Sequence, residues 1–407
     1  MELQPSPEAI AHSMQLSNLI ENEVKNNQGS IPFARFMDLA LYLPKYGYYS
    51  GGLTKLGASG DFITAPEISK WFGATVCMTL LPILHYFSNS QKKTQILEIG
   101  AGTGALAQSI LLQLQQSNHL PDFYYILEIS PELRDRQKNQ LAIFCQSHQI
   151  STNMIWLDDF PNNFEGIILA NEVLDAIPID LIIKRVDSWY YRHVQRLNSS
   201  SVSPTLPYWE FIDGHKVAKE DLPKSLSAIE NTLPVGYQTE IHPQSNAWIK
   251  RIAECLQEGI FLTFDYGFPA REYYHLQRCE GTLMAHFRHQ NFPNVLSYPG
   301  VCDITSHVEW TTLNETALAS GLTLHGYTSQ GAYLLDAGIG DLLLSELDPQ
   351  DSEVFIPQAN GIQKLISEAE MGELFKAILW AKFPEKNDLM NSQEKVLPGF
   401  RGRLRSL

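Results

Sequence analysis

Three closely spaced glycines are the feature of this sequence that most suggests ligand binding. They lie in the segment Ile96-Leu-Glu-Ile-Gly-Ala-Gly-Thr-Gly-Ala-Leu-Ala107, whose pattern indicates a strand, a turn and the start of a helix. Glycine at Gly100, Gly102 and Gly104 lets the backbone turn tightly and leaves room for a ligand where a Cβ atom would clash. The same string also satisfies the G-x-G-x-x-G/A pattern of dinucleotide sites, so the glycines alone leave the ligand open.

Two glutamates narrow the choice of ligand. Glu98 stands two residues before the first glycine, where its charge favours a cationic ligand and disfavours a pyrophosphate. S-adenosylmethionine carries a sulfonium and an ammonium group, so its charge matches. Glu128 ends the next predicted strand, from which a carboxylate can accept hydrogen bonds from both hydroxyls of a ribose. Glu128 suits any adenosine ligand, whereas Glu98 helps to separate S-adenosylmethionine from a dinucleotide, and we predict S-adenosylmethionine as the cofactor.

Further polar side chains follow the third and fourth predicted strands. Asp158-Asp159-Phe160 comes after the third strand, where Asp159 could accept the adenine amino group and Phe160 could stack on the ring. An ordinary acidic turn explains these residues nearly as well. Asn171 ends the fourth strand, and we group it with the predicted cofactor residues.

Several segments outside the glycine turn resemble a known protein family. They are Gly60-Asp-Phe-Ile-Thr-Ala-Pro-Glu67, Asn171-Glu-Val-Leu-Asp-Ala-Ile-Pro178, Phe264-Asp-Tyr-Gly267, Gly281-Thr-Leu283, Pro299-Gly-Val-Cys-Asp-Ile-Thr-Ser-His-Val-Glu309 and Glu370-Met-Gly-Glu-Leu-Phe-Lys376. With them the chain resembles the MidA family of S-adenosylmethionine-dependent methyltransferases. The resemblance implies a class I methyltransferase fold and S-adenosylmethionine as the cofactor. It also implies protein arginine methylation, the activity attributed to relatives that assist mitochondrial complex I assembly, and hence a protein substrate of the complex I subunit type.

Acidic residues after the fourth and fifth strands could hold the methyl acceptor. The guanidinium of arginine stays protonated in water, and carboxylates bind it in a fork geometry. Glu172 and Asp175 lie in what should be the first helical turn after the fourth strand, which would place both on one face. We predict that they orient the guanidinium and receive its proton; helix capping is the alternative for each. Asp265, after the fifth strand, should reach the same edge of the sheet and either line the acceptor cleft or stabilise a turn.

Alternating apolar and helical segments must position these residues. From Gln95 onward the alternation predicts βαβ units and a parallel sheet with helices on both faces. We therefore expect an α/β fold, Rossmann-like, with a mostly parallel seven-stranded sheet of the class I methyltransferase type. Residues 266–310 show no helical or strand period, and we expect an irregular lid over the acceptor site. The expected order is N-terminal helical extension, core, β-rich insertion, core, lid, core and tail, at residues 1–90, 91–181, 182–245, 246–265, 266–310, 311–385 and 386–407.

The composition disfavours several classes of protein. The 407 residues are 44% hydrophobic and 18% charged, which favours a folded core over disorder. A net charge of −15 repels phosphodiesters, so nucleic acid is not an expected partner. The five cysteines form no CxxC pair, which argues against a disulfide framework and fits a reducing compartment. Because no signal peptide, membrane-spanning stretch or metal-ligand spacing is recognisable, we predict a cytoplasmic protein without a metal.

Two other functions stay open at this point. An NAD-dependent oxidoreductase would need a proton donor near the nicotinamide, and the chain has no Tyr-x-x-x-Lys arrangement to supply one. An assembly chaperone that binds S-adenosylmethionine and methylates only incidentally is also compatible with the sequence. The oligomeric state is open as well, with a homodimer among the candidates.

Overall fold

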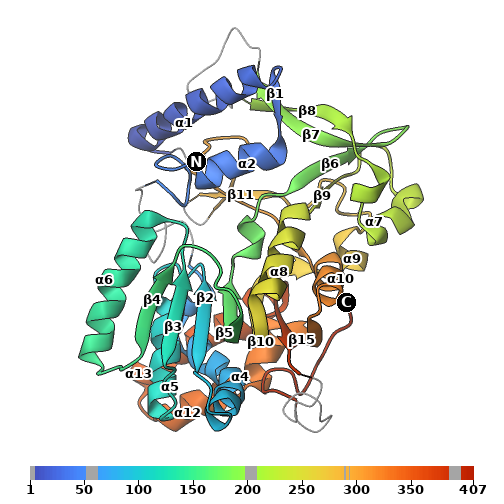
Figure 1. Cartoon of the computed structure of the whole chain (residues 1–407). Helices are drawn as coiled ribbons and strands as arrows, with labels where there is room; N and C mark the ends of the chain where they lie inside the picture. Colours follow the sequence, from blue (N-terminus) through green and yellow to red (C-terminus); the bar gives the residue numbers. More distant parts are fainter. Residues whose placement is uncertain (1–4, 52–62, 198–208, 288–289, 293, 385–395) are drawn as a thin grey trace. The chain divides into compact units, whose positions relative to one another are not determined.

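The computed structural model forms two compact units. Unit 1 comprises Met1–Phe62, Leu174–Ala247 and Phe268–Leu313, and unit 2 comprises Ile63–Val173, Trp248–Gly267 and Asn314–Leu407. The residues described are 5–51, 63–197, 209–287, 290–292, 294–384 and 396–407 (Figure 1). The first residues of one family-like segment, Gly60, Asp61 and Phe62, lie outside this description.

Unit 2 is built on a sheet whose strands follow one another in the order β15-β16-β10-β5-β2-β3-β4 (Figure 1). The strands are β2 Gln95–Ile99, β3 Phe123–Leu127, β4 Asn153–Leu157, β5 Phe164–Asn171, β10 Leu256–Phe268, β15 Thr323–Ser329 and β16 Phe375–Lys382. Neighbours from β4 through β10 are parallel, whereas β16 is antiparallel to both β10 and β15. The predicted α/β fold with a mostly parallel sheet is therefore confirmed. Within the residues described, the sheet has eight strands rather than the predicted seven, because the two-residue strand β14 Val308–Glu309 also belongs to it.

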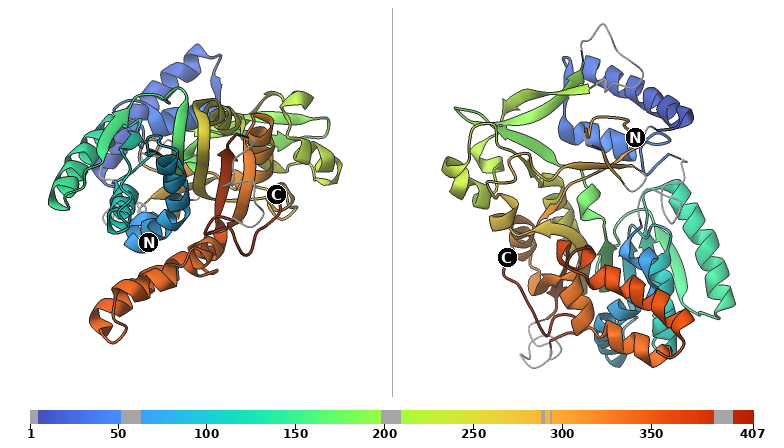
Figure 2. Two further views of the ribbon diagram at one scale, coloured as in Figure 1. Left: turned by 60° about the horizontal axis from the view of Figure 1, so that its bottom comes forward. Right: turned by 180° about the vertical axis from the view of Figure 1, so that it is seen from behind.

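Helices pack against this sheet because its strands are apolar on both faces, as parallel strands usually are. The helices are α3 Ala65–Ile68, α4 Lys70–Asn89, α5 Ala105–Gln116, α6 Pro131–Ser147, α8 Pro243–Cys255, α10 Trp310–Ala319, α11 Gln330–Asp336, α12 Ile339–Glu346, α13 Ser352–Ile366 and α14 Met371–Leu374; α8 and α10 begin in unit 1. One continuous core joins the sheet to α4, α5 and α11–α13. In Figure 2 (left) the orange helices α12 and α13 extend beyond the sheet.

Helix α4 is long and apolar. Among the described residues it is the one helix long and apolar enough to cross a membrane, and 67% of its most apolar stretch is buried. Trp71, Phe72 and Leu80 of α4 belong to the core of unit 2. A core helix of a soluble protein passes the same test of length and composition, so the helix is weak support for a membrane span.

Unit 1 consists of smaller sheets and short helices. Its helices are α1 Pro7–Asn26, α2 Phe33–Tyr42, α7 Lys224–Ile229 and α9 Ala270–Tyr273. A sheet of order β1-β7-β6-β9, with β8 paired to β7, contains β1 Ser30–Pro32, β6 Asp180–Lys184, β7 Trp189–Arg196, β8 Trp209–Lys216 and β9 Gln238–Ile241. A second sheet contains β11 Met284–Phe287, β12 Gln290–Phe292 and β13 Asp303–Thr305. The irregular segment expected at 266–310 thus holds α9 and these strands, which are too short to show a period in the sequence.

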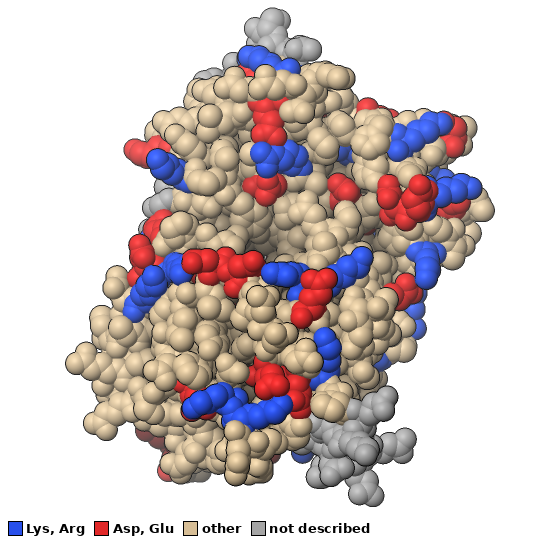
Figure 3. Space-filling model, viewed as in Figure 1, with Lys and Arg blue, Asp and Glu red and all other residues tan. Residues whose placement is uncertain are grey.

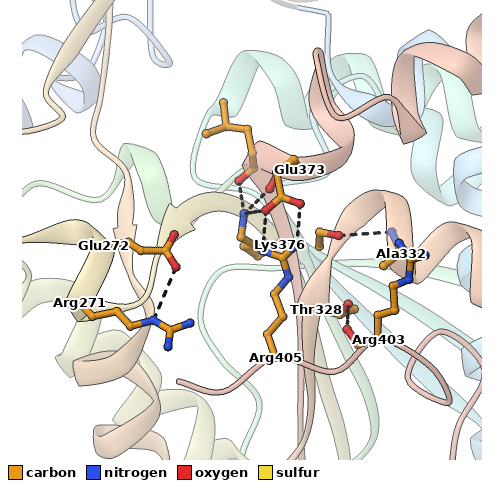
Figure 4. A network of polar contacts seen from close by, with 10 residues as sticks. Arg271, Glu272, Thr328, Ala332, Glu373, Lys376, Arg403 and Arg405 are labelled. Carbon is orange, nitrogen blue, oxygen red and sulfur yellow. Dashed lines mark hydrogen bonds and ion pairs between the residues drawn. The ribbon is translucent and has the colours of Figure 1, made fainter. Parts of the chain in front are cut away.

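The last residues of the chain are docked on unit 2. The N–H of Arg405 donates to the carbonyl of Tyr327 at 2.8 Å, and the Thr328 hydroxyl donates to the carbonyl of Arg403 at 2.7 Å. The Arg405 guanidinium forms two hydrogen bonds of 2.5 Å with the Glu373 carboxylate (Figure 4). The tail therefore lies along β15, the strand that ends the sheet.

Candidate active site

The glycine turn joins β2 to α5 in unit 2. Gly100, Gly102 and Gly104 have φ angles of +66°, +54° and +82°, which glycine adopts readily and most residues do not. The N–H of Gly100 donates to the carbonyl of Leu127 at 3.0 Å, and Gly104 directly precedes α5. The backbone conformation therefore favours glycine at these positions, as the sequence predicted.

Glu128 lies beside this turn, just after β3. Its side chain is 8% exposed, and its Oε1 and Oε2 atoms accept hydrogen bonds from the Ser130 N–H at 2.9 Å and the Gln137 amide at 3.0 Å. The same Gln137 amide donates to the carbonyl of Gly102 at 2.9 Å. Burial raises the pKa of Glu128, while the hydrogen bonds lower it. Two predicted cofactor residues, Gly102 and Glu128, are thus brought together by a side chain that the sequence analysis did not single out.

Glu98 lies inside the sheet on β2. It is 2% exposed, and its Oε2 atom accepts a hydrogen bond of 2.7 Å from the Tyr124 hydroxyl. Burial, with a smaller contribution from the charge of Glu128, raises the pKa of Glu98 to about 7. Near neutral pH this carboxyl is therefore only partly ionised.

Asp159 and Phe160 follow β4 at the surface. The Asp159 side chain is 75% exposed, accepts a hydrogen bond of 2.7 Å from the Phe160 N–H and lies 3.4 Å from the Arg251 guanidinium. The Phe160 ring packs edge-on against Trp248, with centroids 6.2 Å apart. This geometry matches the acidic-turn alternative. Elsewhere on the surface too, acidic and basic side chains lie side by side, as the face drawn in Figure 3 shows.

Asn171 and Glu172 occupy the carboxyl end of β5. Glu172 has a φ of +53°, and its N–H donates to the carbonyl of Phe264 at 2.9 Å. Its Oε1 atom accepts hydrogen bonds from the Ala65 N–H at 3.2 Å and the Asn171 amide at 3.1 Å. The Asn171 Oδ1 atom is buried and has no hydrogen-bond partner among the residues described. A buried acceptor without a partner is uncommon, and a bound ligand would satisfy it.

Asp265 lies at the same end of the neighbouring strand β10 and is fully buried. Its Oδ2 and Oδ1 atoms accept hydrogen bonds from the backbone N–H groups of Val173 at 3.1 Å and Tyr266 at 2.9 Å. The structure therefore brings Asp265 to the turn after β5. There its Oδ2 atom contacts the backbone N–H of Val173, the residue that follows Glu172.

Asp175 belongs to unit 1, in the three-residue 3-10 helix Leu174–Ala176. It is buried, and its carbonyl accepts a hydrogen bond of 3.0 Å from the Ser306 N–H. The prediction that Glu172 and Asp175 share one face of a helix is wrong, because Glu172 has a left-handed conformation and the helical turn starts only at Leu174. Spacing alone could not reveal this break.

These residues of unit 2 fit the predicted cofactor. The left-handed glycine turn leads into the N-terminus of α5. The buried Glu128 carboxylate can accept hydrogen bonds from ribose hydroxyls, and a ligand N–H or O–H could donate to the unpaired Asn171 Oδ1 atom. S-adenosylmethionine would supply an electrophilic methyl group at this edge of the sheet. The described residues contain no group of three or more His, Cys, Asp or Glu side chains that could hold a metal ion.

Known proteins resemble this chain in sequence and in fold. The sequence model of Methyltransf_28, a family of S-adenosyl-L-methionine-dependent methyltransferases, matches residues 75–328. A COG1565-superfamily protein from Burkholderia thailandensis, crystallised with S-adenosyl-homocysteine, is 38% identical, with a TM-score of 0.88 and 99% of each chain covered. A native crystal structure of a COG1565-superfamily protein from the same organism is 37% identical, with a TM-score of 0.85 and 99% of each chain covered.

Curated relatives carry a more specific name. The mitochondrial protein arginine methyltransferase NDUFAF7 homolog of Caenorhabditis elegans is 26% identical, with 97% of this chain and 92% of that protein covered. The homolog of Drosophila melanogaster is 28% identical over 88% of this chain and 82% of its own. The family model spans more than half of the chain, so the chain belongs to this family of S-adenosyl-L-methionine-dependent methyltransferases and is an enzyme of that class.

Proposed function

We propose that this methyltransferase is a protein arginine N-methyltransferase that acts on a partner protein. The names of the curated relatives support the choice of acceptor. The structural observation that carries the proposal is the conformation of Glu172 at the carboxyl end of β5, where open α/β sheets bind their ligands.

Glu172 is held in place at an energetic cost. A non-glycine residue in the left-handed region costs about 1 kcal/mol or more, and such residues cluster at functional sites. Hydrogen bonds from the Ala65 N–H and the Asn171 amide hold its Oε1 atom. Its own N–H donates to the carbonyl of Phe264. A carboxylate oriented in this way suits the binding of a cation.

Catalysis of methyl transfer depends mainly on the alignment of the acceptor nitrogen with the methyl group, because transfer from a sulfonium is an in-line displacement. Glu172 would bind the acceptor guanidinium through charge-assisted hydrogen bonds and turn one nitrogen toward the methyl group. As that nitrogen gains its bond to carbon it loses a proton, which the Glu172 carboxylate accepts. Asp265 binds the backbone N–H of the residue after Glu172, so we assign it the role of positioning Glu172. Asp175 remains a predicted second acidic partner of the acceptor.

The partner and the compartment are part of the same proposal. The family resemblance makes a subunit of the respiratory complex I type the first acceptor to test. Four cysteines carry free thiols, namely Cys77, Cys145, Cys255 and Cys279, and two of them, Cys77 and Cys255, are buried, which suits a reducing cytoplasm.

The test is a methyl-transfer assay on partners trapped from cells, with mass spectrometry to locate the modified side chain. Glu172→Gln keeps the shape of the side chain and removes its charge, so we expect at least a hundredfold slower transfer with S-adenosylmethionine affinity nearly unchanged. Glu165→Gln is the matched control at the other end of β5 and should transfer methyl groups like the wild type. Asp175→Asn tests the second carboxylate in the same assay.

Different failures point to different errors. Wild-type rates in both Glu172→Gln and Asp175→Asn would remove these carboxylates from the chemistry. Methylation of a partner with a lysine in place of the acceptor arginine would contradict the guanidinium as acceptor, since an ammonium cannot make the paired contacts. Loss of cofactor binding together with activity would place Glu172 in the cofactor site instead.

A further inference from the structure

Gln137 is a buried polar residue on a helix that buries little else. Helix α6 buries only Gln137 and Leu141, and the Gln137 side chain has no exposed surface. Burial of a side-chain amide is unfavourable unless its donors and its acceptor are satisfied. The position would otherwise suit an apolar residue, so the amide needs a specific explanation.

All parts of the amide are engaged. Its Nε2 atom donates to the carbonyl of Gly102 at 2.9 Å and to Oε2 of Glu128 at 3.0 Å, and its Oε1 atom accepts from the Trp156 indole N–H at 3.0 Å. The flipped orientation would set the amide oxygen against two acceptors and the amide nitrogen against a donor. The three neighbours therefore fix the orientation of the amide.

These contacts join two elements of the cofactor site that come from different parts of the chain. Gly102 belongs to the turn after β2, and Glu128 follows β3. We propose that Gln137 is a positioning residue of the cofactor site, whose amide holds the Glu128 carboxylate and the Gly102 backbone in the arrangement that receives the ribose hydroxyls of S-adenosylmethionine. The proposal concerns the cofactor alone and does not depend on arginine as the acceptor.

The chemistry of glutamine suits this position. A neutral amide can donate to a carboxylate without neutralising it, so Glu128 keeps its ability to accept from a diol. Burial raises the pKa of Glu128, and the hydrogen bonds from Ser130 and Gln137 oppose that rise. A lysine or arginine in place of Gln137 would form an ion pair with Glu128 and compete with the ribose for its lone pairs.

The experiment measures binding by calorimetry, with S-adenosylhomocysteine and its 2′-deoxy and 3′-deoxy counterparts as probes. Gln137→Leu removes both donors at similar volume, and we expect it to weaken S-adenosylhomocysteine binding by about tenfold. The penalty for lacking a ribose hydroxyl, which is large in the wild type, should shrink in this variant because Glu128 is no longer oriented. Gln140→Leu, on the exposed side of α6, is the matched control and should bind like the wild type.

A purely structural role would give another pattern. If Gln137→Leu weakened all three probes by the same factor, or bound them like the wild type, the proposal would be wrong. If Gln137→Leu folds poorly, Trp156→Phe provides a second test. The Trp156→Phe change removes only the indole N–H that orients the Gln137 amide oxygen. It should show the same reduced penalty for the deoxy probes to a smaller extent, and an unchanged penalty would also overturn the proposal.

Discussion

Asp265 holds Val173 in place: its Oδ2 atom accepts a hydrogen bond from the Val173 N–H, 3.1 Å away. Because Val173 directly follows Glu172, this contact links the end of β10 to the turn that carries the strained glutamate. The second oxygen of Asp265 is occupied by the Tyr266 N–H, at 2.9 Å. The carboxylate therefore acts on the acceptor side of the site through the backbone.

Replacement of Asp265 by asparagine should affect both stability and transfer. The amide group of Asn would set a donor against one of two backbone donors in a fully buried place, at a cost of about 1.5–3 kcal/mol. We expect a lower urea midpoint and a lower kcat, with S-adenosylmethionine affinity nearly intact. Asp122→Asn, at the opposite end of the sheet, where the carboxylate accepts from Thr94, should lower stability without lowering kcat. Equal kcat in Asp265→Asn and wild type would contradict a positioning role.

Backbone strain at Glu172 can be measured with a pair of substitutions. Both Glu172→Gly and Glu172→Ala lose the carboxylate, but only glycine adopts a φ of +53° at no steric cost. We expect the glycine variant to be more stable than the alanine variant by about 1 kcal/mol in urea unfolding, while neither transfers methyl groups at a normal rate. The same pair at Lys138, an exposed position within α6, should show the opposite order. Alanine more stable than glycine at position 172 would mean that the turn is not strained.

Local sequence patterns correctly predicted the strand, turn and helix that surround the cofactor site. The apolar run before Gly100 and the glycine spacing are properties of short stretches of chain, and the structure has β2, the turn and α5 where the sequence placed them. Glu128 was found because parallel strands end at a common edge of the sheet. These features follow from rules that connect neighbouring residues.

Features that depend on distant contacts were missed. The left-handed turn at Glu172 depends on hydrogen bonds to Ala65 and Phe264, which no local pattern shows. Gln137 was overlooked because a glutamine in a polar helix resembles a surface residue until its three partners are known.

The pKa of Glu98 predicts a dependence of stability on pH. With a pKa raised from 4.5 to about 7 by burial, the folded protein keeps a proton between these values that the unfolded chain has lost. The free energy of unfolding should therefore fall as pH rises through this window, by a contribution on the order of 3 kcal/mol, and level off above it. Glu98→Gln can still accept from Tyr124 and has no proton to lose. Its stability relative to the wild type should rise from pH 5 to pH 8 in urea titrations.

A constant difference between the two proteins across that range would show that Glu98 has an ordinary pKa. Glu128, the neighbouring buried acid, remains in both proteins, so its own titration largely cancels in the comparison. The same pair tests the predicted charge role of Glu98. If the ionised carboxylate favours a sulfonium, the preference for S-adenosylmethionine over S-adenosylhomocysteine should grow with pH in the wild type alone.

The C-terminal tail offers two anchors of very different strength. Phe400 is buried in the core of unit 2, where the centroid of its ring lies 5.3 Å from the centroid of the Tyr333 ring. Arg405 and Glu373 form a paired ion contact, but their side chains are 37% and 41% exposed. Phe400→Ala should lower the free energy of unfolding by about 3–5 kcal/mol, because it removes a large apolar side chain and leaves a cavity.

Arg405→Ala should lower the free energy of unfolding by at most about 1 kcal/mol, since water screens an exposed pair and holding both side chains in one geometry costs entropy. Leu404→Ala, at an exposed position between the two anchors, is the control and should leave the urea midpoint unchanged. A larger loss in Arg405→Ala than in Phe400→Ala would contradict this ranking. It would show that the tail is held mainly through Glu373, beside Lys376 at the start of β16, rather than by its apolar anchor.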